Sequence, residues 1–427
     1  MIINRESVKE LTTKLSEPAW LADSRLEAWE SYLSRPMPTQ RDEDWRRTDI
    51  GALDLTRLQT EALRRSDAKA VLEHVPGVAT ELTEELKQQG VTFCDIATAL
   101  EMHGDKIRGY ILDADSAPDK FSLLNRALFN SGVFIHIPRN VNVTTPLFVG
   151  LELADDAVSE GYGAAVFPRL IIVAEDNSSV DVVLSLRSAD GSSKRVESSL
   201  ASALIDVHVK PGAKVNYLEV QDFAHNVFYV ERLNSNVDKD GTFNSLSIAL
   251  GGKQTKADIA TYLEAPGSQS SVLGAVLGSE SSKFSYNTIQ EHNAPDTTSD
   301  INFRVALKDN ASSVYQGIIR VDKTAQRTNA YQSNKNLLLG GEAKADSIPK
   351  LEILADDVKC SHGATVGPVD REQLFYLRSR GLTEIEAEEL VVLGFFRKVL
   401  EQFPVTSTMD WLTEVISEKI TSVGKNG

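Results

Sequence analysis

A stretch of roughly 190 residues, from Phe167 to Leu354, contains strand and turn patterns but no segment with the length and periodicity of a helix. Short runs rich in valine and isoleucine, such as 170–173, 180–183 and 205–209, are typical of strands. A chain that continues this long without a helix must fold as a sandwich, a barrel, a propeller or a solenoid.

Turn-forming pairs divide this stretch at a loose interval. Counted from the second residue of each pair, the pairs are 35, 29, 26 and 43 residues apart: Asp176-Asn177, Pro211-Gly212, Asp240-Gly241, Pro266-Gly267 and Asp309-Asn310. A spacing of about 30 residues without the signature of a propeller blade favours a β-helix, in which each coil buries its inward side chains on the next.

Helical patterns flank the β-rich stretch on both sides. Near the start, residues 7–10 fit a capping box, and residues 20–33 show helical periodicity that ends before Pro36 and Pro38. The segment 41–49 is dense in charge around Trp45, which favours a solvated connection held to the core by its tryptophan. We therefore expect an N-terminal helical region at 1–90, a β-helix core at 91–366 and a C-terminal helical region at 367–427.

The C-terminal region has a short helical segment at 371–379 and a longer one that begins with a capping box at Thr383 to Glu386. Two apolar stripes run along the longer helix: Ala387, Val391, Phe395 and Val399 form one, and Leu393, Phe396, Leu400 and Phe403 form the other. One buried face needs only one stripe. Either the helix is enclosed within its own domain, or the second stripe, with Leu393, Phe396 and Leu400, binds a partner.

Composition and charge exclude several functions. A formal net charge of -16 argues against a general binder of nucleic acid or anionic membranes, because both need clustered lysine and arginine. No apolar run is long enough to span a bilayer, and the first residues lack a signal-peptide pattern. We expect a cytoplasmic protein, and its two cysteines, Cys94 and Cys360, are too few for a disulfide framework.

Common catalytic motifs fail in this chain. Gly251-Gly252-Lys253-Gln254 comes nearest to a phosphate-binding P-loop, but Ser247 and Gln254 stand where that motif requires Gly and Ser or Thr. Gly161-Tyr162-Gly163 lacks the third glycine of the dinucleotide fingerprint. Common hydrolase signatures are also absent, so we expect that this chain does not turn over ATP or a dinucleotide by itself.

Cys360 and His362 are the best candidates for chemistry. If they lie on a strand, alternation points both side chains to the same face, where they could bind one iron or zinc ion. A complete site usually needs about four ligands, so the others must come from elsewhere or from a second chain. Four further histidines, His136, His208, His225 and His292, are isolated, and ordinary structural roles suit them better.

Long motifs surround this pair. The runs 347–353 and 360–367, continuing into 374–381, resemble the SufB/SufD family of iron–sulfur cluster assembly proteins. The run Cys-Ser-His-Gly-Ala-Thr at 360–365 is most similar to the SufD branch. Further upstream, 314–317, 326–332, 336–339 and 44–48 agree, so the similarity covers most of the chain.

The resemblance implies a right-handed parallel β-helix and a complex in which a SufD-like subunit pairs with a SufB-like subunit through the β-helices. It implies that an ATPase of the SufC type binds each C-terminal helical region. It also implies that His362 lies at the SufB–SufD interface and shares a transient iron or iron–sulfur cluster with a SufB cysteine. We expect Cys360 to be a secondary ligand or a thiol that protects the site. We expect no cofactor bound tightly to the isolated chain, which could form a homodimer.

Two further functions remain possible. The chain could be a purely structural partner that stabilises the SufB-like subunit and recruits the ATPase without contacting iron. A sugar-processing β-helix enzyme would need paired carboxylates on one face, and Asp181 and Glu219 show no such pairing in the sequence.

Overall fold

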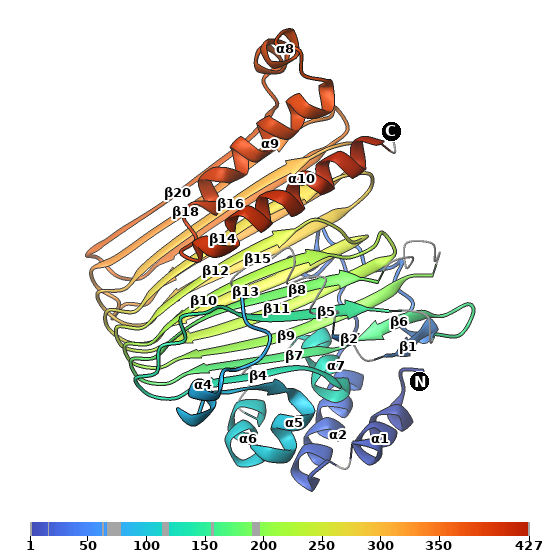
Figure 1. The fold of residues 1–427 in the computed structure, drawn as a ribbon, viewed down its shortest axis with the longest axis vertical. Coiled ribbons are helices and arrows are strands. Elements are labelled where there is room, and N and C mark those ends of the chain that lie inside the picture. Colours follow the sequence, from blue (N-terminus) through green and yellow to red (C-terminus); the bar gives the residue numbers. More distant parts are fainter. Residues whose placement is uncertain are drawn as a thin grey trace.

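The computed structural model describes residues 2–15, 17–61, 64–65, 78–112, 119–154, 158–189 and 197–425. Its centre is a parallel β-solenoid of about 6 turns, with helices at both ends (Figure 1). Each coil gives one strand to each of two sheets, because successive strands alternate between them. The mainly β fold expected from the absence of helices between Phe167 and Leu354 is thus confirmed.

The first sheet pairs its strands in the order β19-β17-β15-β13-β11-β9-β7-β4-β3, with β6 also paired to β9 and β1 paired to β6. Their bounds are β1 Leu58–Thr60, β3 Thr92–Asp95, β4 Ser131–Ile137, β6 Gly163–Val166, β7 Pro168–Ala174, β9 Ser199–Val209, β11 Val227–Val237, β13 Gln254–Leu263, β15 Lys283–His292, β17 Ser312–Val321 and β19 Lys344–Ile353.

The second sheet has the order β2-β5-β8-β10-β12-β14-β16-β18-β20. Its strands are β2 Arg64–Arg65, β5 Leu147–Leu153, β8 Ser179–Ser188, β10 Lys214–Asp222, β12 Thr242–Ala249, β14 Gln269–Gly278, β16 Thr298–Leu307, β18 Thr328–Leu338 and β20 Val358–Pro368. The pairs from β8 to β20 are parallel and in register, so equivalent residues of neighbouring coils lie above one another.

Turn residues with positive φ mark the same corner of successive coils. They are Asn177, Gly212, Asp240, Gly267, Asp296 and Arg327. Glycine, asparagine and aspartate tolerate this conformation best, which is why four of the predicted pairs mark this corner. Asp309 lies at the opposite corner, between β16 and β17, and this explains the longer interval of 43 residues before Asn310.

Helices cover the outer faces of both sheets. The N-terminal group consists of α1 Arg5–Lys14, α2 Ala19–Ser34, α4 Glu84–Gln88, α5 Ile96–Met102, α6 Gly104–Leu112 and α7 Lys120–Leu128. Most of this group packs in one apolar cluster with the outer side chains of the first sheet, including Phe134, Ile171 and Phe228. The C-terminal helices are α8 Arg371–Ser379, α9 Glu384–Leu400 and α10 Met409–Lys425. α9 and α10 lie along the second sheet, and α8 stands away from it (Figure 1).

The structure corrects two expectations about the N-terminal half. The first helix is capped by Asn4, whose side chain accepts from the Ser7 amide, so Ser7 is the third helical residue of the capping box and does not begin it. Helices α5 to α7 lie between 96 and 128, where strands were expected. The apolar residues of this segment form the buried faces of these helices. Residues 66–77, part of the range expected to be helical, lie outside the described residues.

Candidate functional site

The last coil of the solenoid is open. Its strands β19 and β20 end the two sheets, and in the described part of the chain neither has a strand on its outer side. Side chains that point inward from this coil, including Ala345, Leu351, Val358 and Cys360, contact the solenoid core from one side only. An unpaired edge offers backbone N–H and C=O groups to another chain.

Cys360 and His362 lie on β20, as the sequence predicts. Strand alternation directs both toward the interior side of the coil. Cys360 is half-buried and packs against the core, whereas His362 is exposed because no further coil covers it. The imidazole is therefore the accessible member of the pair.

The neighbouring strand β18 places a polar side chain next to His362. His362 is in register with Gln332 of β18, whose side chain is fully buried. Both amide atoms of Gln332 lack a hydrogen-bond partner among the described residues. A buried amide without partners is costly, so the open end has unused hydrogen-bonding capacity directly below the histidine.

Burial raises the pKa of the Cys360 thiol, an effect that a hydrogen bond involving the Ala330 backbone only partly offsets. The thiolate is the form that binds metals, so Cys360 in this state is a weaker ligand than an ordinary exposed cysteine. Among the described residues there is no group of three or more His, Cys, Asp or Glu side chains that could hold a metal ion. The pair at 360 and 362 is therefore at most part of a site.

The N-terminal segment reaches the same coil. Glu43 forms an ion pair with Lys350 of β19, and Arg47 pairs with Asp346 at 3.3 Å. Between them Trp45 is buried, stacking on Phe121, which confirms that the tryptophan holds this segment to the core. The segment 43–47 thus holds β19, a strand of the open coil, in place through two ion pairs.

The predicted partner-binding residues are largely covered by the chain itself. Phe396 and Leu400 are buried in the apolar cluster that α9 and α10 form with the second sheet, and Leu393 is partly buried there. Both predicted stripes pack within the protein, because the helix lies in the angle between the sheet and α10. Phe396 and Leu400 are therefore not available as a partner surface in this structure.

A different apolar surface lies nearby, on α8 and the start of α9. Phe375 is 75% exposed, Tyr376 56% and Leu390 50%. The sequence signal for it was the run Leu374-Phe375-Tyr376-Leu377, since four consecutive apolar residues extend around a whole turn of a helix and cannot all be buried on one side. We call Phe375, Tyr376 and Leu390 the α8 surface.

The other histidines have local roles. His292 is fully buried between the hydroxyls of Thr297 and Ser299, at 2.7 and 2.9 Å, and burial lowers its pKa to about 4. His136 contacts Glu175, His208 packs on Tyr110, and His225 pairs with Glu280 at 3.5 Å. The structure brings none of them to the open end.

The family model described as "SUF system FeS cluster assembly, SufBD core domain" matches residues 157–395, which include the solenoid from before β6 and most of α9. The chain belongs to this family. It is 30% identical to the iron–sulfur cluster assembly protein SufD of Bacillus subtilis, over 98% of each chain. It is also 27% identical to a SufBD family protein of Staphylococcus epidermidis and 26% identical to one of Staphylococcus aureus, in both cases over 98% of this chain and 93% of the relative.

The family assignment confirms the resemblance found in the 347–381 motifs, with SufD as the branch that the chain is most like. It places the protein in the SUF system of iron–sulfur cluster assembly. None of the helices in the described residues is long and apolar enough to span a membrane.

Proposed function

We propose that this chain is the SufD-like subunit of a SUF scaffold. It pairs with a SufB-like subunit through the open end of its solenoid, and a nascent iron–sulfur cluster, or its iron, is held between the two chains. A SufC-like ATPase binds its C-terminal helices and supplies the energy, so the chain itself is not an enzyme.

The open end is the observation that carries this proposal. β20 is 11 residues long and its outer edge is unpaired among the described residues. β19 contains Pro349, which lacks an N–H and interrupts that edge as a hydrogen-bond donor. A partner strand would therefore bind most regularly to β20, the strand that carries His362.

The incomplete ligand set supports a shared site. His362 is exposed on the inward side, Cys360 adjoins it, and no third ligand lies near them in the described structure. Iron in such a site needs further ligands, which a cysteine of the second subunit would provide. Closure of two ATPase subunits would pull on the C-terminal helices, open the seam between the solenoids and expose the site.

Replacing His362 by alanine should reduce cluster formation in the complex with a SufB-like and a SufC-like protein. The imidazole is a direct ligand in this proposal, so iron binding should weaken by more than the roughly 10–100-fold that follows the loss of an outer-shell partner. Cys360→Ser should have a smaller effect, because burial already disfavours its thiolate. The measurement is anaerobic reconstitution with iron and sulfide, followed by visible absorption and Mössbauer spectroscopy.

His103→Ala is the matched control, because this histidine lies at the end of α5, far from β20. A cluster yield in the His362 variant equal to that of the wild type and of this control would rule out the ligand role. The chain would then be a purely structural partner, which is the second candidate function. That function would still require the subunit interface and the ATPase contact.

Replacing Phe375 and Tyr376 together by aspartate should abolish co-purification of the SufC-like ATPase. The α8 surface is the exposed apolar part of the C-terminal region, and two charges there would oppose burial in an interface. The free energy of unfolding should change little, since neither side chain is buried. Met102→Asp, at a residue 70% exposed on α5, is the control for adding charge at an exposed apolar site. ATPase capture at wild-type levels by the double variant would place the contact elsewhere.

A further inference from the structure

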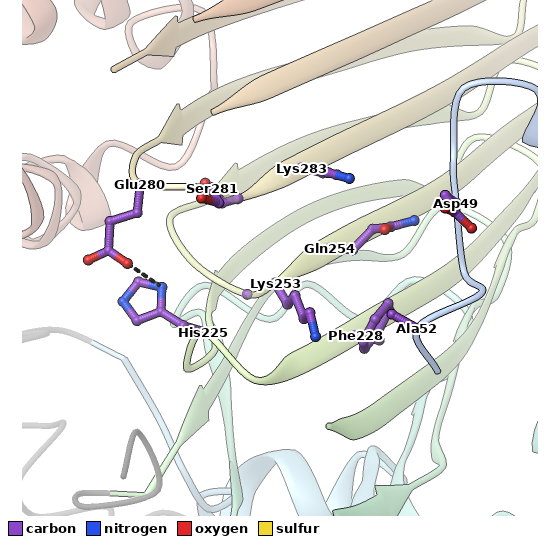
Figure 2. Close-up of a pocket in the computed structure, with 11 residues that line it drawn as sticks. Asp49, Ala52, His225, Phe228, Lys253, Gln254, Glu280, Ser281 and Lys283 are labelled. Carbon is purple, nitrogen blue, oxygen red and sulfur yellow. Dashed lines mark ion pairs between the residues drawn. The ribbon is translucent and has the colours of Figure 1, made fainter. Parts of the chain in front are cut away.

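A cavity of about 340 Å³ lies outside the site described above, between the turns that precede β13 and β15 and the N-terminal segment around Asp49 (Figure 2). Residues 252–254 form one wall, residues 280–283 form the next, and His225 and Phe228 come from the preceding coil. A cavity of this size is within the range of small-molecule sites.

The wall at 252–254 belongs to the segment Gly251 to Gln254, which resembles a P-loop without meeting its pattern. Gly252 has φ +95, and a Cβ at Gly251 would lie 2.3 Å from the Phe223 carbonyl, so the turn depends on both glycines. The amides of Gly252 and Lys253 are already bonded to the carbonyls of Phe223 and Val227. A ligand would therefore be bound by side chains, and not by the backbone cradle of a P-loop.

Two ammonium groups face this cavity, and neither has a carboxylate partner among the described residues. Lys253 contacts the Ser198 hydroxyl at 3.4 Å and lies 5.2 Å from the Phe228 ring centre. Lys283 has no ion pair among the described residues, and its backbone amide is bonded to the Lys253 carbonyl, so the two lysines occupy neighbouring coils. Figure 2 shows both amino groups on the side that faces the Asp49 loop.

Gln254 provides an independent sign of a missing ligand. Its side chain is 5% exposed and lines the cavity, and its Nε2 is buried without a hydrogen-bond acceptor in the described structure. In Figure 2 the side-chain amide of Gln254 lies on the same side of the cavity as the amino groups of Lys253 and Lys283. A buried N–H donor of this kind needs an acceptor, which an oxygen of a bound anion would supply.

Two acidic residues line the cavity, and they lie at different ends of it. Glu280 pairs with His225 at the other end of the view in Figure 2. Asp49 accepts a hydrogen bond from the Gly51 amide at 2.8 Å, in an exposed loop. Among the described residues that line the cavity, Asp49 is thus the carboxylate on the lysine side, and its charge would oppose an anion there.

We propose that this cavity binds a small molecule through a phosphate group, which the ammonium groups of Lys253 and Lys283 neutralise and to which the Gln254 amide donates. A phosphate near neutral pH carries close to two negative charges, which matches two lysines. Phe228 gives the cavity an apolar wall for the rest of the ligand. The proposal is independent of the function proposed for the open end.

Calorimetric titration of the full chain with inorganic phosphate, at constant ionic strength, tests the proposal. We expect saturable binding that Lys253→Gln and Lys283→Gln each weaken about tenfold. Asp49→Asn should tighten binding severalfold, because it removes the opposing charge and keeps an oxygen that can accept from Gly51. The variants are at exposed positions, and circular dichroism melting verifies that each remains folded.

Lys239→Gln is the control, since it removes the same charge from an exposed turn at another corner of the solenoid. If Lys239→Gln weakens phosphate binding as much as the cavity variants do, binding depends only on the total charge of the protein, and the proposal is overturned. Absence of saturable binding to the wild type, unchanged binding in both lysine variants, or equally tight binding of acetate would overturn it as well.

Discussion

Replacing Phe396 by alanine should lower the free energy of unfolding by about 3–5 kcal/mol, the cost typical of removing a buried phenylalanine. The side chain is fully buried in the cluster that holds α9 and α10 on the second sheet. Its removal leaves a cavity lined by residues of two helices and a sheet, which cannot all move to fill it. Urea denaturation followed by circular dichroism measures the change.

Phe375→Ala is the matched control, because it removes the same side chain from the α8 surface, where it is 75% exposed. It should change the free energy of unfolding by no more than about 0.5 kcal/mol. Equal destabilisation by the two variants would contradict the assignment of Phe396 to the core. The two variants also separate stability from partner binding. If the Phe396 variant fails to bind the ATPase, the reason is that α9 has detached from the sheet, and not that a contact with the ATPase was removed.

The second large effect should come from Glu231, as a dependence of stability on pH. Glu219 and Glu231 lie on β10 and β11 inside the solenoid, both almost fully buried. Glu219 accepts hydrogen bonds from the hydroxyls of Tyr217 and Tyr229, at 2.7 and 2.9 Å. Burial, and then the charges of Glu219 and Asp258, raise the pKa of Glu231 well above its ordinary value. The folded protein therefore keeps the Glu231 proton to a higher pH than the unfolded chain does.

The direction of the pH effect follows from this raised pKa. An unfolded glutamate has a pKa near 4.3. Above that pH the unfolded chain releases the proton that folded Glu231 retains, so stability should fall as the pH rises, by up to about 1.4 kcal/mol per pH unit, until the folded pKa is reached. Glu231→Gln keeps an uncharged group of similar size and should remove this dependence, which makes the variant more stable than the wild type at pH 8.

Urea denaturation at a series of pH values between 5 and 9 tests this expectation. Glu264→Gln, at an exposed glutamate in the turn after β13, is the control and should leave the slope unchanged. A Glu231→Gln variant with the wild-type slope would show that other groups determine the pH dependence.

Much of the fold was predictable because its signals are local. The turns at Asn177, Gly212 and Gly267 need a backbone conformation that few residues adopt, so their spacing gave the coil length. The bounds of α8 and the capping box of α9 were also predicted correctly. The helices between 96 and 128 were missed, because short apolar runs fit a buried helix as well as a strand.

The candidate sites were predictable to a lesser degree. Strand alternation was enough to place Cys360 and His362 on one face. The sequence showed the two apolar stripes of α9, but it did not show what they pack against. In the structure Phe396 is buried against the second sheet and α10. The cavity at Lys253 and the Glu219–Glu231 pair combine segments from different coils, which no short-range pattern relates.

The sequence by itself therefore determined the local conformations: where the coils turn, where α8 and α9 begin, and which face of β20 carries the thiol and the imidazole. Only the tertiary structure decided what covers each face. His362 is exposed because the solenoid ends at its coil, and Phe396 is buried because the second sheet lies beneath it. The physical reason is that a periodic pattern specifies which side chains share a face, whereas burial depends on which distant segments pack against that face.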